Sequence, residues 1–186
     1  MRARKSPSSE KNRARTKKST DGAGRTVYVG LGSNLGDRRA HLGAALARIA
    51  RLAPLSRISS MYSSEPVGFD RQPSFLNVVA EIRWRGSARS LLAALKRVER
   101  EGGREATFRN GPRVIDCDIL DFGGRVASFR DLTLPHPRLA TRRFALAPLA
   151  EIAPLWQHPV LGLTARQLLD RLPRQPSVRR LPKKLS

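Results

Sequence analysis

The order in which strand-like and helix-like segments follow one another limits the folds open to this chain more than any other feature. Strand patterns, with alternating or β-branched apolar residues, begin at Thr26, Leu55, Ser74 and Val114. Helical patterns separate the first strand from the second and the third from the fourth, so the order is β-α-β-β-α-β. This is the split βαβ order of ferredoxin-like sandwiches. We therefore expect an α+β fold with helices on one face of an antiparallel sheet, plus C-terminal additions.

Capping residues mark the ends of the two helical patterns. Apolar residues recur at helical spacing through the first pattern, at Leu42, Leu46, Ile49 and Leu52. Asp37 is placed to cap its start, Ser87 is placed to cap the second helix, and Gly102 is placed to end that helix. Beyond the fourth strand we expect a loop that becomes a short helix near Arg143, and a last small helix within "LTARQLLDRL".

The length and the charge of the chain limit the classes of protein to which it can belong. A chain of 186 residues indicates one domain, which we place at residues 26–175. The formal net charge of +21 favours anionic partners such as nucleic acid, phosphorylated small molecules or an acidic membrane surface, although a solvated Arg-rich surface would give the same charge. No apolar run approaches the roughly 20 residues that span a bilayer, so we expect no membrane insertion. The single cysteine, Cys117, excludes an intramolecular disulfide and suits a reducing, cytoplasmic compartment, where we expect a monomer.

Both ends of the chain are basic and poor in large apolar side chains. Residues 1–25 cannot bury enough surface to offset their ordering entropy, so we expect a disordered extension. An arm that contacts nucleic acid non-specifically and an organellar transit peptide are the alternatives, but the segment lacks the apolar face of a transit peptide. We expect residues 176–186 to form a second basic tail.

The stretch "RNGPRVIDCDILDFGG" holds two aspartates one position apart within an apolar strand pattern. Because side chains alternate along a strand, Asp116 and Asp118 leave the same face roughly 7 Å apart, while Cys117 points the other way. Two carboxylates in an apolar setting repel each other and lose hydration, so they require a proton or a cation. Two kinds of cation meet this requirement. One is Arg113 or Arg109 in a buried ion pair, and the other is Mg²⁺, which keeps several waters and completes its shell with substrate phosphates.

Basic residues gather directly before this strand and again after it. Arg104, Arg109 and Arg113 come from the loop "GGREATFRNGPR", and His136 and Arg142 come from "LPHPRLATRRFAL". Guanidinium groups bind phosphate oxygens in a bidentate manner and neutralise charge that develops during phosphoryl transfer. A solvated basic loop and a structural histidine are the alternatives for these residues. Together with the carboxylate pair, the set indicates a site for Mg²⁺ and a polyphosphate.

The Gly-rich stretch "GLGSNLGD" follows the first strand, which is the usual position of a phosphate-binding loop. It matches neither G-x-x-x-x-G-K-[ST] nor G-x-G-x-x-G, so the motif alone does not identify a nucleotide loop. The alternative is a tight strand-to-helix turn in which Asn34 and Asp37 serve as caps.

Four stretches together resemble the 6-hydroxymethyl-7,8-dihydropterin pyrophosphokinases of folate biosynthesis. They are "VYVGLGSNLGDR", "SSEPVGFDRQPSFLNVV", "RNGPRVIDCDILDFG" and "LTLPHPRLATRRFALAPLAEIAP", and the resemblance extends from about Thr26 to Pro154. It implies a ferredoxin-like α+β fold and the transfer of a pyrophosphoryl group from ATP to the pterin hydroxymethyl oxygen, with release of AMP. ATP and 6-hydroxymethyl-7,8-dihydropterin are the partners that it implies.

The same resemblance assigns roles to residues at matching positions. Asp116 and Asp118 would hold two Mg²⁺ ions that arrive with ATP. The basic residues with a catalytic role would be Arg104, Arg113, His136 and Arg142. The residues at the ATP site would be Glu99, Arg109, Arg113, His136 and Arg142. The residues against the pterin would be Val67, Phe75, Asn77 and Phe144. An aromatic sandwich and a bifunctional amide suit a flat heterocycle, although ordinary core packing is the alternative for the two phenylalanines.

The chain does not match the family pattern at every position, and a rival function is compatible with the same fold. Many members carry Trp where this chain has Asn110, so the resemblance implies no aromatic lid at that position. The rival is an RNA-binding module, in which a basic ferredoxin-like domain tracks a phosphate backbone on its sheet. Such a module requires exposed aromatic residues on central strands and no paired acids. Few aromatics are present, and Asp116 and Asp118 would face the RNA phosphates, so the sequence favours the enzyme.

Overall fold

An antiparallel sheet forms the centre of the molecule. The computed structural model describes residues 24–66, 72–105 and 111–182. Strand β1 (Arg25–Ser33) lies between β4 (Phe75–Trp84) and β5 (Asp116–Phe122), and it pairs antiparallel with both. These three strands carry most of the buried valines and isoleucines among the described residues, which suits them to the middle of the sheet. The predicted antiparallel sheet is thus confirmed.

Three short strands extend the sheet beyond β4. Strands β2 (Leu55–Ile58) and β3 (Tyr62–Ser64) both pair with β4, and β8 (Val178–Arg180) pairs with β3 at the edge. We predicted a single strand from Leu55, but Ser59 divides it. Its side-chain oxygen accepts the Val79 N–H at 3.0 Å, so a side chain takes the place of a backbone partner there. Strand β8 lies inside residues 176–186, which we expected to be a tail.

Two long helices cover one face of the sheet, as the sequence predicts. Helix α1 (Arg38–Leu52) begins after Asp37, whose carboxylate accepts the Ala40 N–H at 3.0 Å. Helix α2 (Ala88–Glu101) begins after Ser87, whose hydroxyl oxygen accepts the Ser90 N–H at 3.0 Å, and it ends at Gly102. Both predicted N-caps and the predicted helix end are confirmed.

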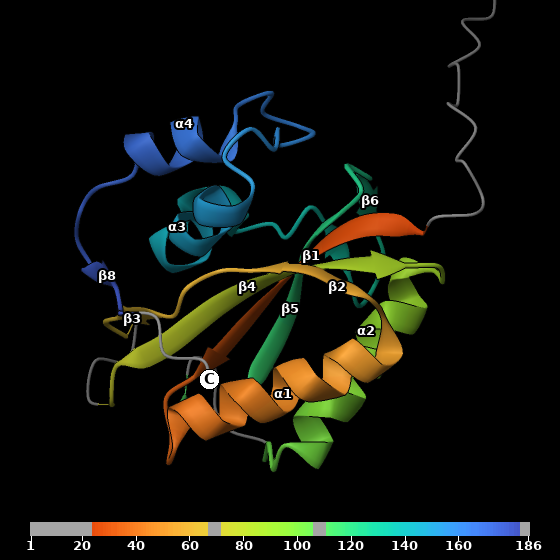
Figure 1. Ribbon diagram of the computed structural model, residues 1–186. Helices are drawn as coiled ribbons and strands as arrows, with labels where there is room; N and C mark the ends of the chain where they lie inside the picture. Colours follow the sequence, from red (N-terminus) through yellow and green to blue (C-terminus); the bar gives the residue numbers. More distant parts are fainter. Residues whose placement is uncertain (1–23, 67–71, 106–110, 183–186) are drawn as a thin grey trace, which may run out of the picture.

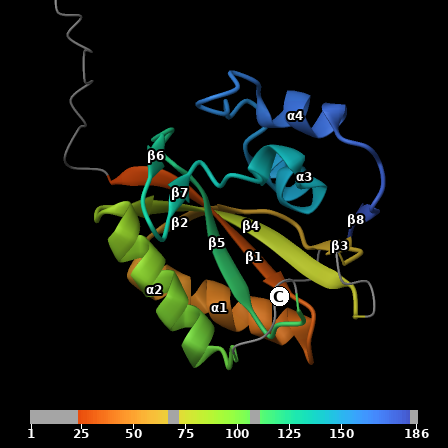
Figure 2. The same cartoon turned by 180° about the vertical axis from the view of Figure 1, so that it is seen from behind.

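The opposite face of the sheet carries two further helices, which confirm those predicted near Arg143 and within "LTARQLLDRL"; their place on this face was not predicted. Helices α3 (Arg143–Ile152) and α4 (Ala165–Arg171) lie above the sheet in Figure 1, with α1 and α2 below it. Figure 2 shows the same two layers of helices, with the sheet between them, from behind. Tyr28, Val79 and Leu120 point from the sheet into this second core. Within the described residues, no helix is long and apolar enough to cross a membrane.

A small hairpin and a short turn of helix connect β5 to α3. The hairpin consists of β6 (Ala127–Ser128) and β7 (Thr133–Leu134), and the 3-10 helix η1 (Leu139–Thr141) follows it. The N–H of His136 donates to Leu120 O at 2.9 Å. This bond holds the connection against β5, and so it brings the basic residues that follow the hairpin to the two aspartates of that strand.

Candidate functional site

One cavity of about 320 Å³ contains most of the residues that the sequence singles out. It is lined by the end of β1, the start of β4 and the start of β5, and by residues from η1, α3 and the segment after α4. The predicted residues that line it are Phe75, Asn77, Arg113, Asp116, Asp118, Arg142 and Phe144. Val67 and Arg109 lie outside the described residues, as does Asn110.

Two glycines form the floor of this cavity beside the aspartates. In the pairing of β1 with β5, Gly30 lies opposite Asp118 and Gly32 lies opposite Asp116. A Cβ added at Gly32 would come within 3.3 Å of Asn77 Oδ1. Within "GLGSNLGD", Gly30 and Gly32 therefore serve the site because they have no side chains and so leave room next to the carboxylates.

Asn34 is a site residue whose role the sequence analysis missed. We expected it to cap a turn, but it is 1% exposed and joins two loops instead. Its Oδ1 accepts the Arg113 N–H at 2.8 Å, and its Nδ2 donates to Gln72 Oε1 at 2.9 Å. Asn34 thus fixes the backbone of the Arg113 loop next to β5. The position of Asn34 after a strand gave no signal of these partners, which lie far away in the sequence.

Asp116 is neutralised by two arginines. Arg113 Nη1 donates to its Oδ2 at 2.7 Å, and Arg104 Nη1 donates to its Oδ1. Burial would raise the pKa of Asp116, but Arg113 and Arg104 outweigh it, so this pKa lies below its ordinary value. The ion-pair alternative is therefore confirmed for Arg113, and Arg104 is a second partner.

Glu99 lies behind the cavity and does not line it. It is 2% exposed on α2, where its Oε1 accepts the Cys117 N–H at 2.7 Å and its carboxylate pairs with Arg104 and Lys96. Glu99 thereby connects α2 to β5 and holds Arg104 against Asp116. Cys117 points into the core between the sheet and the long helices, as predicted, and its burial raises the pKa of the thiol.

Asp118 is less tightly held than Asp116. Its side chain is 39% exposed, and its Oδ2 lies 4.0 Å from His136 Nε2 and 4.0 Å from Arg142 Nη1. His136 Nδ1 accepts the Arg138 N–H at 3.1 Å, and Arg142 Nη1 lies 3.4 Å from His136 Nε2. Burial lowers the pKa of His136 despite the attraction of Asp118, so the ring is neutral near pH 7.

The two phenylalanines and the asparagine lie at the other end of the cavity. Phe75 and Phe144 are both partly buried and line it. Asn77 is buried, and its Nδ2 donates to Ser64 Oγ at 2.8 Å, which fixes the orientation of the amide. The Arg142 guanidinium carbon lies 5.4 Å from the centre of the Phe144 ring. The cavity therefore has an aromatic end and a charged end, and Arg142 contacts both.

The possible metal ligands at the charged end of the cavity are carboxylate oxygens. Among the described residues, no three His, Cys, Asp or Glu side chains gather as a metal cage. Asp116 and Asp118 supply oxygen ligands from one side only, which is the chemistry of a hard cation that keeps waters and shares substrate phosphates. Asp118 is free enough to bind such a cation directly, whereas Asp116 would first have to release an arginine.

Comparisons with known proteins agree on one family. Residues 28–154 match the family model described as 7,8-dihydro-6-hydroxymethylpterin-pyrophosphokinase. The chain is 41% identical over 135 residues to the 2-amino-4-hydroxy-6-hydroxymethyldihydropteridine pyrophosphokinase of Aquifex aeolicus, which covers 73% of this chain and 84% of that one. It is 42% identical over 128 residues to the protein of the same name from Bacillus subtilis, which covers 68% of this chain and 77% of that one.

Longer relatives also match. The chain is 34% identical over 176 residues to the folic acid synthesis protein FOL1 of Dictyostelium discoideum, which covers 95% of this chain and 27% of that protein. The crystal structure of wild-type Plasmodium falciparum HPPK-DHPS aligns with a TM-score of 0.64 at 13% identity over 79% of this chain and 44% of that one. This chain thus spans about a quarter of the first protein and less than half of the second. At this identity, the likeness to the crystal structure shows a shared fold.

Proposed function

Because the chain belongs to the 7,8-dihydro-6-hydroxymethylpterin-pyrophosphokinase family, we infer that it transfers a pyrophosphoryl group from ATP to 6-hydroxymethyl-7,8-dihydropterin. The products are the pterin diphosphate and AMP, and the reaction is a step of folate biosynthesis. The observation that carries this inference is the cavity itself, which combines an aromatic end with an end of paired carboxylates and arginines. One substrate is a flat heterocycle and the other a polyphosphate, so each end suits one of them.

The aromatic end would hold the pterin. We propose that the ring system stacks between Phe75 and Phe144, with Val67 as a further contact. Asn77 already donates from Nδ2 to Ser64, so its Oδ1 is the atom that would accept a hydrogen bond from the pterin edge. Buried amides that are fixed in this way discriminate strongly between heterocycles with matching and mismatched edges.

The charged end would hold the ATP phosphates. Arg104, Arg109, Arg113 and Arg142 would donate to phosphate oxygens, and neutral His136 would contact them as well. Glu99 is the remaining residue of the proposed ATP site, and its contacts give it a positioning role through Arg104. Arg104 and Arg113 would exchange their contacts with Asp116 for contacts with phosphate when ATP binds.

The carboxylates would hold the metal. We propose that Asp116 and Asp118 bind two Mg²⁺ ions that arrive with ATP, since carboxylate oxygens on one side of a phosphate site are the ligands that this ion prefers. When bound, the ions neutralise charge on the phosphates and orient them. In exchange for the released arginines, Asp116 would then gain a metal partner of greater charge.

The chemical step requires positioning more than acid–base catalysis. The hydroxymethyl oxygen forms a bond to the β-phosphorus of ATP, and the bond from that phosphorus to the oxygen leaving with AMP breaks. Phosphoryl transfer of this kind relies on alignment and charge neutralisation, with little need for a general base. Phe75, Phe144 and Asn77 would hold the alcohol in place, and the arginines and His136 would stabilise the transferred group.

The finer division of the chain is also a proposal. The sheet order β5-β1-β4-β3 supports a ferredoxin-like core, to which α3, α4 and β8 would be the C-terminal additions. We propose a basic extension at residues 1–25, an enzyme domain at 26–175 with β8 added to its sheet, and a basic tail after it. We further propose a cytoplasmic monomer whose N-terminal extension contacts nucleic acid non-specifically.

A thermal-shift experiment separates the enzyme from the rival RNA-binding module. ATP with Mg²⁺ should raise the Tm of the full chain, and a pterin added with a non-hydrolysable ATP analogue should raise it further, because ligands that bind only the folded state stabilise it. A single-stranded RNA oligonucleotide should leave the Tm unchanged. A larger shift with RNA than with ATP and Mg²⁺ would favour the RNA-binding module.

A further inference from the structure

The segment after α4 contributes a wall to the cavity, although the family-model match ends at residue 154. The residues that line the cavity from this segment are Leu172, Pro173, Gln175, Pro176 and Val178. In Figures 1 and 2 the chain descends from α4 past α3 and reaches the sheet at β8, next to β3. We call residues 172–178 the C-terminal wall.

The C-terminal wall is in register with one of the two cavity phenylalanines. Val178 lies opposite Ser64 in the pairing of β8 with β3, and Ser64 lies opposite Phe75 in the pairing of β3 with β4. The same Ser64 accepts the hydrogen bond from Asn77 Nδ2 at 2.8 Å. A displacement of β8 would therefore move Ser64, and with it Phe75 and Asn77, which are proposed to hold the pterin.

A reciprocal contact ties this wall to β3. Glu65, which follows the last residue of β3, accepts the Ser177 N–H through Oε2 at 3.1 Å and the Ser177 hydroxyl through Oε1 at 2.9 Å. In return, the Glu65 N–H donates to Ser177 O at 3.3 Å. The Ser177 N–H, followed by its hydroxyl, lowers the pKa of Glu65, so the carboxylate is charged near pH 7. We call this contact the Glu65–Ser177 clasp.

A second anchor connects the wall to the other phenylalanine. Arg143 Nη1 donates to three backbone oxygens that precede or begin the wall, those of Leu169 at 3.3 Å, Leu172 at 3.2 Å and Pro173 at 3.4 Å. Arg143 directly precedes Phe144 at the start of α3. Both phenylalanines are thus tied to the C-terminal wall, one through the sheet and one through this arginine.

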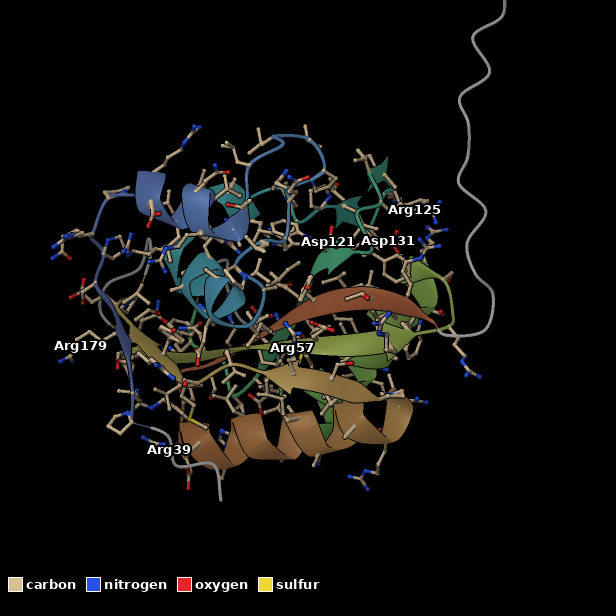
Figure 3. The ribbon with its side chains drawn as sticks, turned by 45° about the horizontal axis from the view of Figure 1, so that its top comes forward. Arg39, Arg57, Asp121, Arg125, Asp131 and Arg179 are labelled. Carbon is tan, nitrogen blue, oxygen red and sulfur yellow. The ribbon has the colours of Figure 1, made fainter. Side chains whose placement is uncertain are left out.

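Beyond the clasp, β8 has its own fixed point on the molecule. Arg180 Nε donates to Ser60 Oγ at 2.9 Å, and its Nη2 pairs with Glu151 Oε1 at 3.0 Å. Arg179, between these anchors, points outward from the edge of the sheet (Figure 3). Strand β8 is therefore held at two points, by the contact of Arg180 with Glu151 of α3 and by the Glu65–Ser177 clasp. Removing the clasp alone should leave β8 paired with β3.

We propose that the C-terminal wall positions the pterin, and that Ser177 acts as a positioning residue by holding the wall through Glu65. This inference rests on the proposed function, because it assigns the aromatic end of the cavity to the pterin. The side-chain hydrogen bonds that hold the wall come from Glu65 and Arg143, and not from Asp116, Arg104 or Arg113. The wall should therefore affect the binding of the pterin and leave that of ATP unchanged. A segment that only seals the sheet edge would instead change stability and leave both Michaelis constants as they are.

Steady-state kinetics of the full chain with ATP, Mg²⁺ and 6-hydroxymethyl-7,8-dihydropterin tests the wall. Ser177→Ala keeps the backbone N–H of the clasp and loses the hydroxyl, so it should raise the KM for the pterin about threefold or more, the scale of one lost hydrogen bond. The KM for ATP and kcat should stay as in the wild type. Ser177→Thr, which keeps a hydroxyl, should restore the wild-type KM. Arg174→Ala removes an exposed side chain that does not line the cavity, and it is the matched control.

A double-mutant cycle tests whether Ser177 acts through Glu65. Glu65→Gln offers one oxygen to two donors, so it should raise the KM for the pterin like Ser177→Ala, and the two changes together should raise it no further than either alone. An unchanged KM for the pterin in an active Ser177→Ala variant would overturn the inference and leave the function intact, as would equal rises in both Michaelis constants. A wild-type chain that forms no AMP would overturn the proposed function and this inference with it.

Discussion

Asp116 and Asp118 leave the same face of β5, but their surroundings differ in kind. Asp116 is bound by two arginines that are themselves largely buried, while Asp118 is partly exposed and faces His136 and Arg142 at 4.0 Å. Asp116 is thus neutralised within the protein itself, and Asp118 is available for a cation. In the proposed metal-binding pair, this difference keeps the cavity without ATP from carrying two unpaired negative charges.

Replacing each aspartate should separate these two roles. Asp116→Ala leaves Arg113 without a carboxylate partner and Arg104 with Glu99 alone, so it should lower the free energy of unfolding by about 1–3 kcal/mol. Asp118→Ala should change it by less than about 0.5 kcal/mol, because its partners lie at the limit of an ion pair. Both should reduce kcat/KM by at least about 10²-fold. Urea denaturation and AMP formation measure the two effects, and an Asp116→Ala variant as stable as the wild type would show that the fold does not depend on the pairing of Asp116 with the two arginines.

Asp121, on the same strand, carries a charge that the site does not use. It is 1% exposed and lies between the sheet and the loop after α3 (Figure 3), where its Oδ2 accepts the Gly124 N–H at 3.0 Å. Burial raises the pKa of Asp121 above its ordinary value. A carboxyl with a raised pKa in the folded state stabilises the fold at low pH, and this contribution is lost as the pH rises through that pKa.

Asp121→Asn should therefore be neutral or stabilising at pH 7, because the amide keeps an acceptor for Gly124 without a buried charge. At a pH below about 3.8, where the wild-type carboxyl is protonated, the difference between the variant and the wild type should vanish. Chemical denaturation at both pH values gives the comparison. A loss of stability in the variant that is larger at pH 7 than in acid would show that the charge is stabilising.

Strand β1 shapes the cavity through its glycines, which have no side chains to fill it. Its glycines lie opposite the aspartates of β5, and Gly32 also lies opposite Asn77 of β4. A strand interior with glycine is weaker than one with a β-branched residue, so the sheet gives up stability here for space at the site. The polar side chains beside this space come from the neighbouring strands β4 and β5.

Gly32→Ala tests this role of β1. The new methyl group would meet Asn77 Oδ1 at 3.3 Å, so the amide would have to shift, and the KM for the pterin should rise several-fold while the KM for ATP changes little. Gly43→Ala in α1 is the matched control, since a Cβ there meets nothing within 4 Å. Equal kinetics in the two variants would show that the close approach at Gly32 is not required.

Sequence reasoning predicted the elements whose signals are local. The order of strands and helices along the chain, the caps at Asp37 and Ser87 and the same-face aspartates all follow from local sequence patterns. The interruption at Ser59 and the bridging by Asn34 were missed, because each depends on a partner that lies far away in the sequence. Strand β8 has three residues and pairs with β3 across most of the chain, so its pattern carried no signal.

The whole molecule is a sheet covered on both faces, with the cavity where the second layer ends. Helices α1 and α2 lie over one face of the sheet (Figure 1). The cavity lies on the other face, where residues of α3 and the C-terminal wall line it together with β1, β4 and β5. The net charge of +21 is far larger than the few basic side chains of the site require. The surplus is a property of the surface and of the chain ends.

A variant that begins at Arg25 tests the role of the N-terminal extension. It should keep the Tm and keep kcat/KM for ATP within about threefold at 0.15 M salt, because charges beyond the Debye length of about 8 Å are screened. The same variant should bind nucleic acid much more weakly than the full chain, since Lys and Arg contacts to phosphate dominate non-specific affinity. A large loss of catalysis would place the extension at the active site.

Product analysis by ³¹P NMR distinguishes pyrophosphoryl transfer from other uses of ATP by this chain. The full chain, incubated with ATP, Mg²⁺ and 6-hydroxymethyl-7,8-dihydropterin, should form AMP and the pterin diphosphate in equal amounts. A pterin with a methyl group in place of the hydroxymethyl group should yield neither product, because it offers no oxygen to the β-phosphorus. Formation of ADP with a pterin monophosphate, or of AMP without the pterin alcohol, would contradict pyrophosphoryl transfer in this cavity.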